Sequence, residues 1–441
     1  MTVTTRFAPS PTGKLHVGNI RTALHNWMWA KKQGGRFLLR IDDTDEARSE
    51  ERFVESIRAD LGWLGMSPDG EQRQSGHFDR YERVFEQLRS AGRIYPCYET
   101  PQELDLKRKV LLGRGLPPIY DRAALKLSEA DRRKLASDGK RPHWRFRLDH
   151  DTPIEWSDRI RGDQHFDPAL LSDPVIRRED ESWLYLLPSV IDDIDMGVTD
   201  VVRGEDHVSN TAVQIQMFEA LDAAPPAFAH EALLTGVEGK LSKRLGSLGA
   251  EHFREEGIEP QALIALLARI GTSDPVEPVA DPAPLIERFD FAHFGRAPAR
   301  FDEEELRMLN AKIVHLLDFD RVAARLPDGM TAEAWDAVRP NLMRVEDADI
   351  WWRVIEGPVD TGHDPADRDF LAQAAELAAN IDWSGDPWHT LTGALKQTTG
   401  RKGRALFLPL RKVLTGHDHG PDMAALLPLI GRERTIARLQ P

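Results

Sequence analysis

Two short polar motifs contain the residues best suited to handle a charged substrate. In the first, "HVGN" (16–19), His16, Gly18 and Asn19 stand where an extended segment gives way to a helical pattern. Free backbone N–H groups and the positive helix end would face a bound anion there, and Gly18 would let a purine or ribose approach closely. His16, helped by Asn19, could donate hydrogen bonds to phosphate oxygens. The alternative is a purely structural role, a strand–helix turn with a solvated histidine.

The second motif, "GKLSKRLG" (239–246), carries Lys240 and Lys243 on either side of a serine, with a glycine at each end. This pattern favours a mobile cationic loop that closes on a polyphosphate and stabilises a leaving pyrophosphate. A solvated basic loop is the alternative for this motif alone. The two motifs together favour phosphate chemistry.

The elements that must position the first motif form an α/β unit. Apolar residues at helical spacing predict a helix from 19 to 33, which Gly34 and Gly35 end. Strands are predicted on either side of it, at 4–11 and 36–43, and a further helix at 49–65. Strand, helix and strand in this order predict a crossover unit with a parallel sheet.

The rest of the chain indicates an inserted module and a helical end. Residues 76–185 are polar and mixed in pattern, with seven Arg or Lys against one Asp across 132–147. A strand-like apolar pattern returns at 182–207. From about 246 the chain is predicted to be helical, and 311–441 has almost no strand signal. The simplest organisation is one α/β domain that an inserted module interrupts.

Composition excludes several classes of protein. A chain of 441 residues with 41% hydrophobic and 29% charged residues predicts a globular protein of two to four domains. No apolar run approaches the roughly 20 residues of a membrane span, and no signal pattern opens the chain. Cys97 is the only cysteine, which predicts a reducing cytoplasm. The net charge of −14 argues against general DNA or RNA coating, although local charge opposes it.

Four linked segments carry a resemblance to a known family. They are "RFAPSPTGKLHVGN" from Arg6, "RIDDTD" from Arg40, "DDIDMGVTDVVRGEDHVSNT" from Asp192, and "KLSKR" from Lys240. In order and spacing they resemble the bacterial glutamyl-tRNA synthetases, within the class I aminoacyl-tRNA synthetases. The resemblance implies an α/β Rossmann-type catalytic domain with an inserted α+β module and an all-α C-terminal anticodon-binding region. The implied parts are a catalytic domain at 1–75 and 186–245, an acceptor-end module at 76–185, stem-contact helices at 246–310, and an anticodon region at 311–441.

The resemblance also implies a pocket for glutamate. Its two carboxylates call for guanidinium groups, and Arg6 and Arg203 each end a predicted strand, where structural ion pairing is their alternative role. Asp42 would meet the ammonium group. Asp42 and Ser189 stand where the family usually has Glu and often has Asn. The implied glutamate-binding residues are Arg6, Ala8, Ser10, Asp42, Tyr185, Ser189 and Arg203.

ATP and tRNA contacts follow from the same resemblance. The catalytic residues would be His16, Lys240 and Lys243. The implied ATP-binding residues are His16, Gly18, Asn19, Asp206, Leu234, Lys240 and Lys243, with His207 close by. Six basic residues and no acid in 395–414 fit an anticodon reader, with surface helices as the alternative. The tRNA candidates are Asp45, Arg401, Lys402, Arg404 and Arg411.

Expected partners and cofactors complete this interpretation. Zinc is not expected, because Glu99 stands where a second cysteine would follow Cys97 and no later cysteine exists. ATP implies Mg²⁺ held by phosphates and water, without dedicated ligands. We expect a cytoplasmic monomer that binds L-glutamate and tRNA-Glu, with tRNA-Gln as an open second substrate. No membrane or DNA partner is expected.

Four other classes of protein share parts of this sequence pattern. A glutaminyl-tRNA synthetase would open closer to "PPEPNG", and a truncated homologue that glutamylates a tRNA base would lack the 311–441 region. A nucleotidylyltransferase of the same superfamily would lack the large basic insertion. A non-catalytic tRNA-binding paralogue would not need His16, Lys240 and Lys243, which are all present.

Overall fold

The computed structural model describes residues 2–236, 248–360 and 364–440. The chain divides into two compact units. The first is built from 1–252, 264–276 and 282–302, and the second from 253–263, 277–281 and 303–441. The finer four-part division at 75, 185, 245 and 310 stays a prediction.

The first unit opens with the predicted strand–helix–strand unit. Its strands are parallel, with Arg6 opposite Leu38 in the register. Gly35 ends the first crossover where a Cβ atom would lie 2.1 Å from the carbonyl oxygen of Val3, so only glycine fits. Four elements lie close to their predicted positions, and β3 was not predicted. The elements are β1 (Thr4–Phe7), α1 (Val17–Lys32), β2 (Arg36–Ile41), α2 (Glu51–Trp63) and β3 (Gly70–Arg73).

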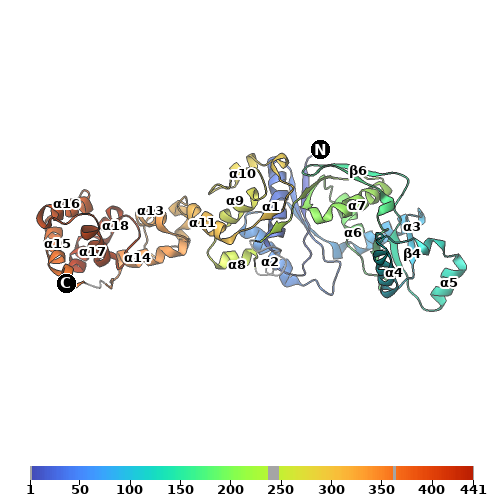
Figure 1. Ribbon diagram of the computed structural model, residues 1–441, viewed down its shortest axis with the longest axis horizontal. Coiled ribbons are helices and arrows are strands. Elements are labelled where there is room, and N and C mark those ends of the chain that lie inside the picture. Colours follow the sequence, from blue (N-terminus) through green and yellow to red (C-terminus); the bar gives the residue numbers. More distant parts are fainter. Residues whose placement is uncertain (1, 237–247, 361–363, 441) are drawn as a thin grey trace. The chain divides into compact units, whose positions relative to one another are not determined.

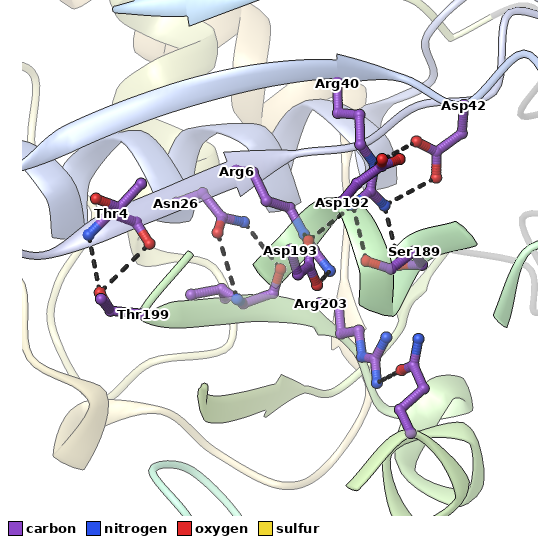
Figure 2. Close-up of polar contacts among 12 residues, drawn as sticks. Thr4, Arg6, Asn26, Arg40, Asp42, Ser189, Asp192, Asp193, Thr199 and Arg203 are labelled. Carbon is purple, nitrogen blue, oxygen red and sulfur yellow. Dashed lines mark hydrogen bonds and ion pairs between the residues drawn. The ribbon is translucent and has the colours of Figure 1, made fainter. Parts of the chain in front are cut away.

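A second parallel pair lies beside β1. It consists of β9 (Asp200–Gly204) and β10 (Ala227–Glu231), joined through α7 (Val208–Ala220). Oγ1 of Thr199, the residue before β9, accepts the backbone N–H of Thr4 at 2.8 Å (Figure 2). The backbone N–H of Thr199 donates to the Thr4 carbonyl at 2.9 Å. The carboxyl ends of these parallel strands therefore share one edge.

The strand-like interpretation of 182–207 is wrong in its first half. Residues Leu186–Asp195 form the helix α6, and only Asp200–Gly204 form a strand. The buried Leu187, Val190 and Ile191 are spaced three and four apart, as on one helix face. A short apolar run cannot be assigned to strand or helix by hydrophobicity alone.

Residues 76–185 fold as mixed helices and antiparallel strands. Tyr81 and Phe85 from this region share one hydrophobic core with Val190 and Val201, so it packs closely on the second half of the parallel sheet. β4, β5 and β8 form one antiparallel sheet, and β6 and β7 form a hairpin. The elements are α3 (Phe78–Ser90), β4 (Ile94–Cys97), α4 (Pro101–Gly113), α5 (Glu129–Ser137), β5 (His143–Phe146), β6 (Ile154–Asp158), β7 (Gly162–Phe166) and β8 (Val175–Arg177).

His143 in this region gives the fold a pH dependence. Burial, with Arg145 nearby, lowers its pKa to about 4, whereas an unfolded histidine titrates near about 6.5. The folded state therefore holds a neutral imidazole, and the unfolded chain takes up the proton first as pH falls. This contribution to stability is complete above pH about 6.5 and is lost as pH falls toward about 4. We expect His143→Gln to lose less unfolding free energy than wild type between pH 7 and pH 5 in urea titrations, and an equal loss would contradict this role.

The remaining elements are almost entirely helical. Figure 1 labels only helices from α11 onward. The predicted class, a Rossmann-type α/β domain with an α+β insertion and an all-α C-terminal region, is confirmed. Among the described residues no helix is long and apolar enough to cross a membrane. The elements are β11 (Leu234–Thr235), α8 (Ala250–Glu255), α9 (Pro260–Arg269), α10 (Ala283–Glu287), β12 (Ala299–Arg300), α11 (Glu303–Val314), α12 (Phe319–Val322), α13 (Ala332–Val338), α14 (Ala348–Glu356), α15 (Arg368–Asn380), α16 (Pro387–Thr399), α17 (Arg404–Thr415), α18 (Met423–Ile430) and α19 (Arg432–Leu439).

Candidate active site

A cavity of about 760 Å³ opens at the carboxyl ends of the parallel strands. Ligands of open α/β sheets bind at this edge, because loops and helix N-termini converge there. The cavity is lined by all of the predicted glutamate-binding residues and by the described members of the predicted ATP set. These are Arg6, Ala8, Ser10, Asp42, Tyr185, Ser189 and Arg203, with His16, Gly18, Asn19, Asp206 and Leu234.

His16 lines the cavity and is the N-cap residue of α1. Its Nδ1 accepts hydrogen bonds from the backbone N–H of Gly18 at 3.2 Å and of Asn19 at 3.4 Å. Burial lowers the pKa of His16, so a neutral ring is favoured. With Nδ1 acting as an acceptor, the ring proton is assigned to Nε2, which is then a hydrogen-bond donor. The first turn of α1 contains no acidic residue to neutralise the positive helix end.

Gly18 and Asn19 shape this helix end. A Cβ atom at Gly18 would lie 3.1 Å from Cε1 of His16, so the glycine gives the imidazole ring its place. The close approach of a purine or ribose to Gly18 stays a prediction. Asn19 accepts the backbone N–H of His16 through Oδ1 at 3.3 Å, which completes a capping box. Their predicted ATP contacts stay predictions.

Arg40, which the sequence reasoning did not select, is the hub of the buried charges. Its Nη1 donates to Asp193 at 2.7 Å, and the same carboxylate receives Nε of Arg6 at 3.2 Å. Arg40 also donates through Nε and Nη2 to the two oxygens of Asp42, at 2.6 and 3.1 Å, and through Nη2 to Oγ of Ser189 at 3.0 Å. Figure 2 shows Arg40 between these partners. Asp42 and Ser189, the two positions that depart from the family pattern, therefore both accept hydrogen bonds from the guanidinium of Arg40.

The balance of charge around Arg40 leaves room for a cationic ligand. Burial alone would lower the pKa of Arg40, but Asp42 and Asp193 outweigh it and raise the pKa. Burial raises the pKa of Asp42 despite the opposing effect of Arg40. A carboxylate held in this state gains from a second positive charge, as an ammonium group would supply.

Replacing Arg40 by methionine is expected to destabilise the protein by about 3–5 kcal/mol, because Asp42 and Asp193 would lose their shared buried partner. Urea unfolding of purified variants measures this change. Arg40→Lys serves as the charge-retaining control and should recover part of the loss. A methionine variant as stable as wild type would show that the hub is not needed for the fold.

Among the described residues, Arg203 differs from Arg6 in having only neutral partners. Its Nη2 donates to Oγ1 of Thr211 at 2.5 Å and to Oε1 of Gln214 at 2.8 Å, and its Nε donates to Nε2 of His230 at 3.3 Å. Within the described part of the chain no carboxylate pairs with Arg203. Burial lowers its pKa to about 10. A buried guanidinium without a counter-ion, at the wall of a cavity, is suited to binding an anion.

Tyr185 and His207 stand next to the two arginines. The Tyr185 hydroxyl lies 3.2 Å from Nδ1 of His207, which also receives Nδ2 of Asn210 at 3.3 Å. Burial, followed by Arg203, lowers the pKa of His207 to about 4, so its ring is neutral near pH 7. Nδ1 is therefore an acceptor for the tyrosine, which fixes the position of the phenol in the cavity.

A second buried cluster fixes the cavity wall that contains Leu234. Glu231 accepts from Thr22 at 2.7 Å and lies 2.5 Å from Nδ1 of His25. Arg21 donates to the carbonyl oxygen of Ala232 at 2.8 Å. These contacts tie α1 to the chain after β10, where Leu234 lines the cavity. The predicted contact of Leu234 with ATP stays a prediction.

Three predicted residues have no described place in this cavity. Lys240 and Lys243 lie outside the described residues. Asp45 does not line the cavity, and its carboxylate pairs with Arg48 at 2.7 Å. Hydrogen bonding from Arg48 lowers the pKa of Asp45.

The four basic candidates of the C-terminal region fall into two groups. Arg401 pairs with Asp367 and lies 4.2 Å over the ring of Phe370, and Arg411 donates to the carbonyl oxygen of Pro421 at 3.0 Å. Lys402 and Arg404 are exposed, and neither forms an ion pair within the described ranges. These two are therefore the cations best placed to meet a ligand.

Cys97 is packed into the inserted region rather than presented to solvent. It is buried, and its Sγ lies 3.7 Å from the hydroxyl oxygen of Tyr120, which donates its single proton to Glu99 at 2.8 Å. Burial raises the pKa of the Cys97 thiol to about 12. Among the described residues no group of three or more His, Cys, Asp or Glu side chains is placed to hold a metal ion.

Comparison with known families assigns the chain. The family model described as "tRNA synthetases class I (E and Q), catalytic domain" matches residues 2–308. The chain belongs to this family of class I tRNA synthetases. A second model, "Anticodon binding domain", matches residues 360–441 of this synthetase. The resemblance inferred from the motifs is thereby confirmed.

Individual relatives agree over the whole length. The synthetase is 68% identical over 438 residues to glutamate–tRNA ligase 1 of Rhizorhabdus wittichii, covering 99% of each chain. It is 68% identical over 440 residues to glutamate–tRNA ligase 1 of Novosphingobium aromaticivorans, covering 100% of each. A crystal structure of a glutamate tRNA ligase from Elizabethkingia meningosepticum in complex with its amino acid superposes with a TM-score of 0.85 at 29% identity, covering 100% of this chain and 98% of that one.

Some of the site residues that the motif analysis did not select have features in the sequence that indicate their role. Arg40 precedes Asp42 by two positions at the end of a strand, so both side chains point to the same face. Asp192 and Asp193 stand within an apolar helix and are buried, a placement that requires partners. Nothing in the local sequence indicated that His230 contacts Arg203.

Proposed function

We propose that the protein is a glutamate–tRNA ligase. The observation that carries this proposal is Arg203, a buried guanidinium in the cavity whose described partners are all neutral. An anionic side chain of the substrate would supply the missing charge. The proposal is further supported by Asp42, which is suited to the substrate ammonium, and by the bare helix end at His16.

The reaction would proceed in two steps without a covalent enzyme intermediate. An oxygen of the glutamate α-carboxylate attacks the α-phosphorus of ATP, the bond to the β-phosphate oxygen breaks, and pyrophosphate leaves. The terminal 2′-hydroxyl oxygen of tRNA then attacks the carbonyl carbon of glutamyl-adenylate and gives up its proton. The bond from that carbon to the phosphate oxygen breaks, and AMP leaves. Both steps depend on positioning and on stabilising developing negative charge.

The proposed role of each site residue follows from its charge. Arg203 and Arg6, with Tyr185, would bind and orient the glutamate carboxylates, while Asp42 binds the ammonium group. His16 would donate its Nε2 proton in a hydrogen bond to a phosphate oxygen at the N-terminus of α1. Lys240 and Lys243 are proposed to stabilise the leaving pyrophosphate. Mg²⁺ would be held by phosphate oxygens and water.

The tRNA contacts are proposed for both ends of the substrate. Asp45 and the basic region within 76–185 would meet the acceptor end. Lys402 and Arg404, which are exposed, would meet anticodon phosphates or bases, while Arg401 and Arg411 hold their segments in place. We also propose that the enzyme works as a cytoplasmic monomer.

A glutaminyl-tRNA synthetase is disfavoured by the same observation. We assign Arg203 to the side-chain carboxylate of glutamate. The side-chain amide of glutamine carries no charge, so in that position it would leave the Arg203 guanidinium buried without a counter-ion.

Charging assays with purified tRNA-Glu and tRNA-Gln test the proposal. We expect ATP-dependent attachment of glutamate to tRNA-Glu, and the tRNA-Gln arm shows whether that tRNA is a second substrate. Failure to charge tRNA-Glu with glutamate in the presence of ATP and Mg²⁺ would contradict the proposed function.

A further inference from the structure

A buried aspartate–histidine pair lies directly behind Arg203. Nδ1 of His230 lies 2.5 Å from Oδ2 of Asp158, and both side chains are fully buried. His230 belongs to β10 of the parallel sheet, whereas Asp158 ends β6 of the inserted region. On its other side, Nε2 of His230 faces Nε of Arg203 at 3.3 Å and the hydroxyl of Thr211 at 2.7 Å.

The hydrogen bonds define one tautomer of His230. Nδ1 faces a carboxylate oxygen, which can only accept, so Nδ1 carries the proton. Nε2 faces the Arg203 N–H, which can only donate, so Nε2 must carry a lone pair. Burial lowers the pKa of His230 despite the neighbouring Asp158, which favours the singly protonated ring that this arrangement requires.

Asp158 is itself held rigidly. Its Oδ1 accepts the backbone N–H groups of Ile160 at 3.0 Å, Arg161 at 2.9 Å and His230 at 3.1 Å. With three donors on Oδ1, only Oδ2 is left for the imidazole. The ring is further confined by Phe228, which stacks on it with centroids 6.0 Å apart.

We propose that Asp158 and His230 are positioning residues, which fix the Arg203 guanidinium for the substrate carboxylate by presenting Nε2 of His230 as an acceptor. This inference rests on the proposed function, because it assigns Arg203 to glutamate. It also makes the orientation of Arg203 depend on the β6–β7 hairpin of the inserted region.

Asp158→Asn is the variant that separates this role from simple packing. The three backbone donors would keep the amide oxygen in the Oδ1 position, so the amide NH₂ would face Nδ1 of His230. An NH₂ group forces the lone pair onto Nδ1 and the proton onto Nε2, which then opposes the N–H of Arg203. In Ser-His-Asp triads the same change leaves the geometry intact and lowers the rate through the wrong tautomer.

The expected result is a selective loss of glutamate binding. At saturating ATP and tRNA, Asp158→Asn should raise the KM for glutamate about 10- to 100-fold, as for loss of one hydrogen bond to a charged group. The KM for ATP should stay unchanged. Asp173→Asn is the matched control, because Asp173 is also buried in the inserted region but pairs with Arg122 at 2.7 Å, away from the cavity lining. It should leave the KM for glutamate unchanged.

A double variant tests the route through the imidazole. Glutamine at 230 has no tautomers and can present its amide oxygen to Arg203, so His230→Gln should cost less than Asp158→Asn. Asp158→Asn should then add little in the His230→Gln background. Nitrogen chemical shifts from ¹⁵N-histidine labelling should show protonated Nδ1 in wild type and protonated Nε2 in Asp158→Asn.

The inference is overturned if Asp158→Asn leaves the KM for glutamate unchanged. It is also overturned if Asp158→Asn raises this KM by the same factor in the His230→Gln background as in wild type. If wild type does not charge tRNA with glutamate at all, the proposed function has failed instead. The two failures are therefore distinguishable in the same series of assays.

Discussion

Arg203→Gln is expected to raise the KM for glutamate about 100- to 1,000-fold, because the substrate carboxylate would lose its buried cationic partner, a loss of about 3–4 kcal/mol. Arg203 holds no carboxylate among the described residues, so its charge is free for the substrate. Steady-state charging of tRNA-Glu with varied glutamate measures the change.

The same substitution should not reduce the stability of the unliganded protein. Arg203 donates to side chains such as Thr211 and Gln214, which can reorient when the guanidinium is removed, and its buried charge has no counter-ion among the described residues. Urea unfolding should therefore give an unfolding free energy equal to or above that of wild type. A marked loss of stability would assign Arg203 to the fold rather than to the substrate.

Arg438→Gln is the matched control for Arg203→Gln. Arg438 is also buried with a pKa lowered to about 10, but its guanidinium donates to the carbonyl oxygens of Leu414, Val354 and Gly357 in the helical second unit. Its replacement should lower stability and leave the KM for glutamate unchanged. The two arginines should thus show opposite effects in the two measurements.

Lys243→Ala is expected to slow formation of glutamyl-adenylate by about 100- to 1,000-fold, the effect of removing one preorganised charge from a transition state. The sequence places Lys243 in a doubly basic, glycine-flanked motif suited to a leaving pyrophosphate. Single-turnover quenching of the enzyme with ATP, glutamate and tRNA measures the rate directly.

Two features keep the Lys243 experiment interpretable. Lys243→Arg retains the positive charge and should lose less activity than the alanine variant. Thermal unfolding should change little in either variant. A single-turnover rate that stays at the wild-type value in Lys243→Ala would remove this residue from the proposed mechanism.

The sequence was most informative where residues that end a strand or start a helix stand next to polar residues suited to binding a ligand. The turn after β1 is followed by His16 at the helix start, and both the elements and the cavity position followed from this order. Residues within the quoted motifs, such as Arg6 and Arg203, line one cavity. Here the signal is local, because a strand end and a helix start dictate where side chains converge.

The parts that could not be predicted depend on pairing across the chain. The sequence of helix α6 resembled a strand because its apolar run is short. Its buried Asp193 pairs with Arg6 on β1 and Arg40 on β2. The contact from Asp158 through His230 to Arg203 joins three separate segments. Such contacts are set by tertiary packing, which one sequence does not display.

The most direct test of the account compares glutamate with glutamine as substrates for wild type on tRNA-Glu. The two amino acids have nearly the same shape and differ in the charge that Arg203 is proposed to read. We expect kcat/KM for glutamate to exceed that for glutamine by about 10⁴-fold or more, as for sites that leave buried polar groups unpaired with the wrong substrate. A ratio below about 10 would contradict the claim that the buried charge of Arg203 selects the substrate.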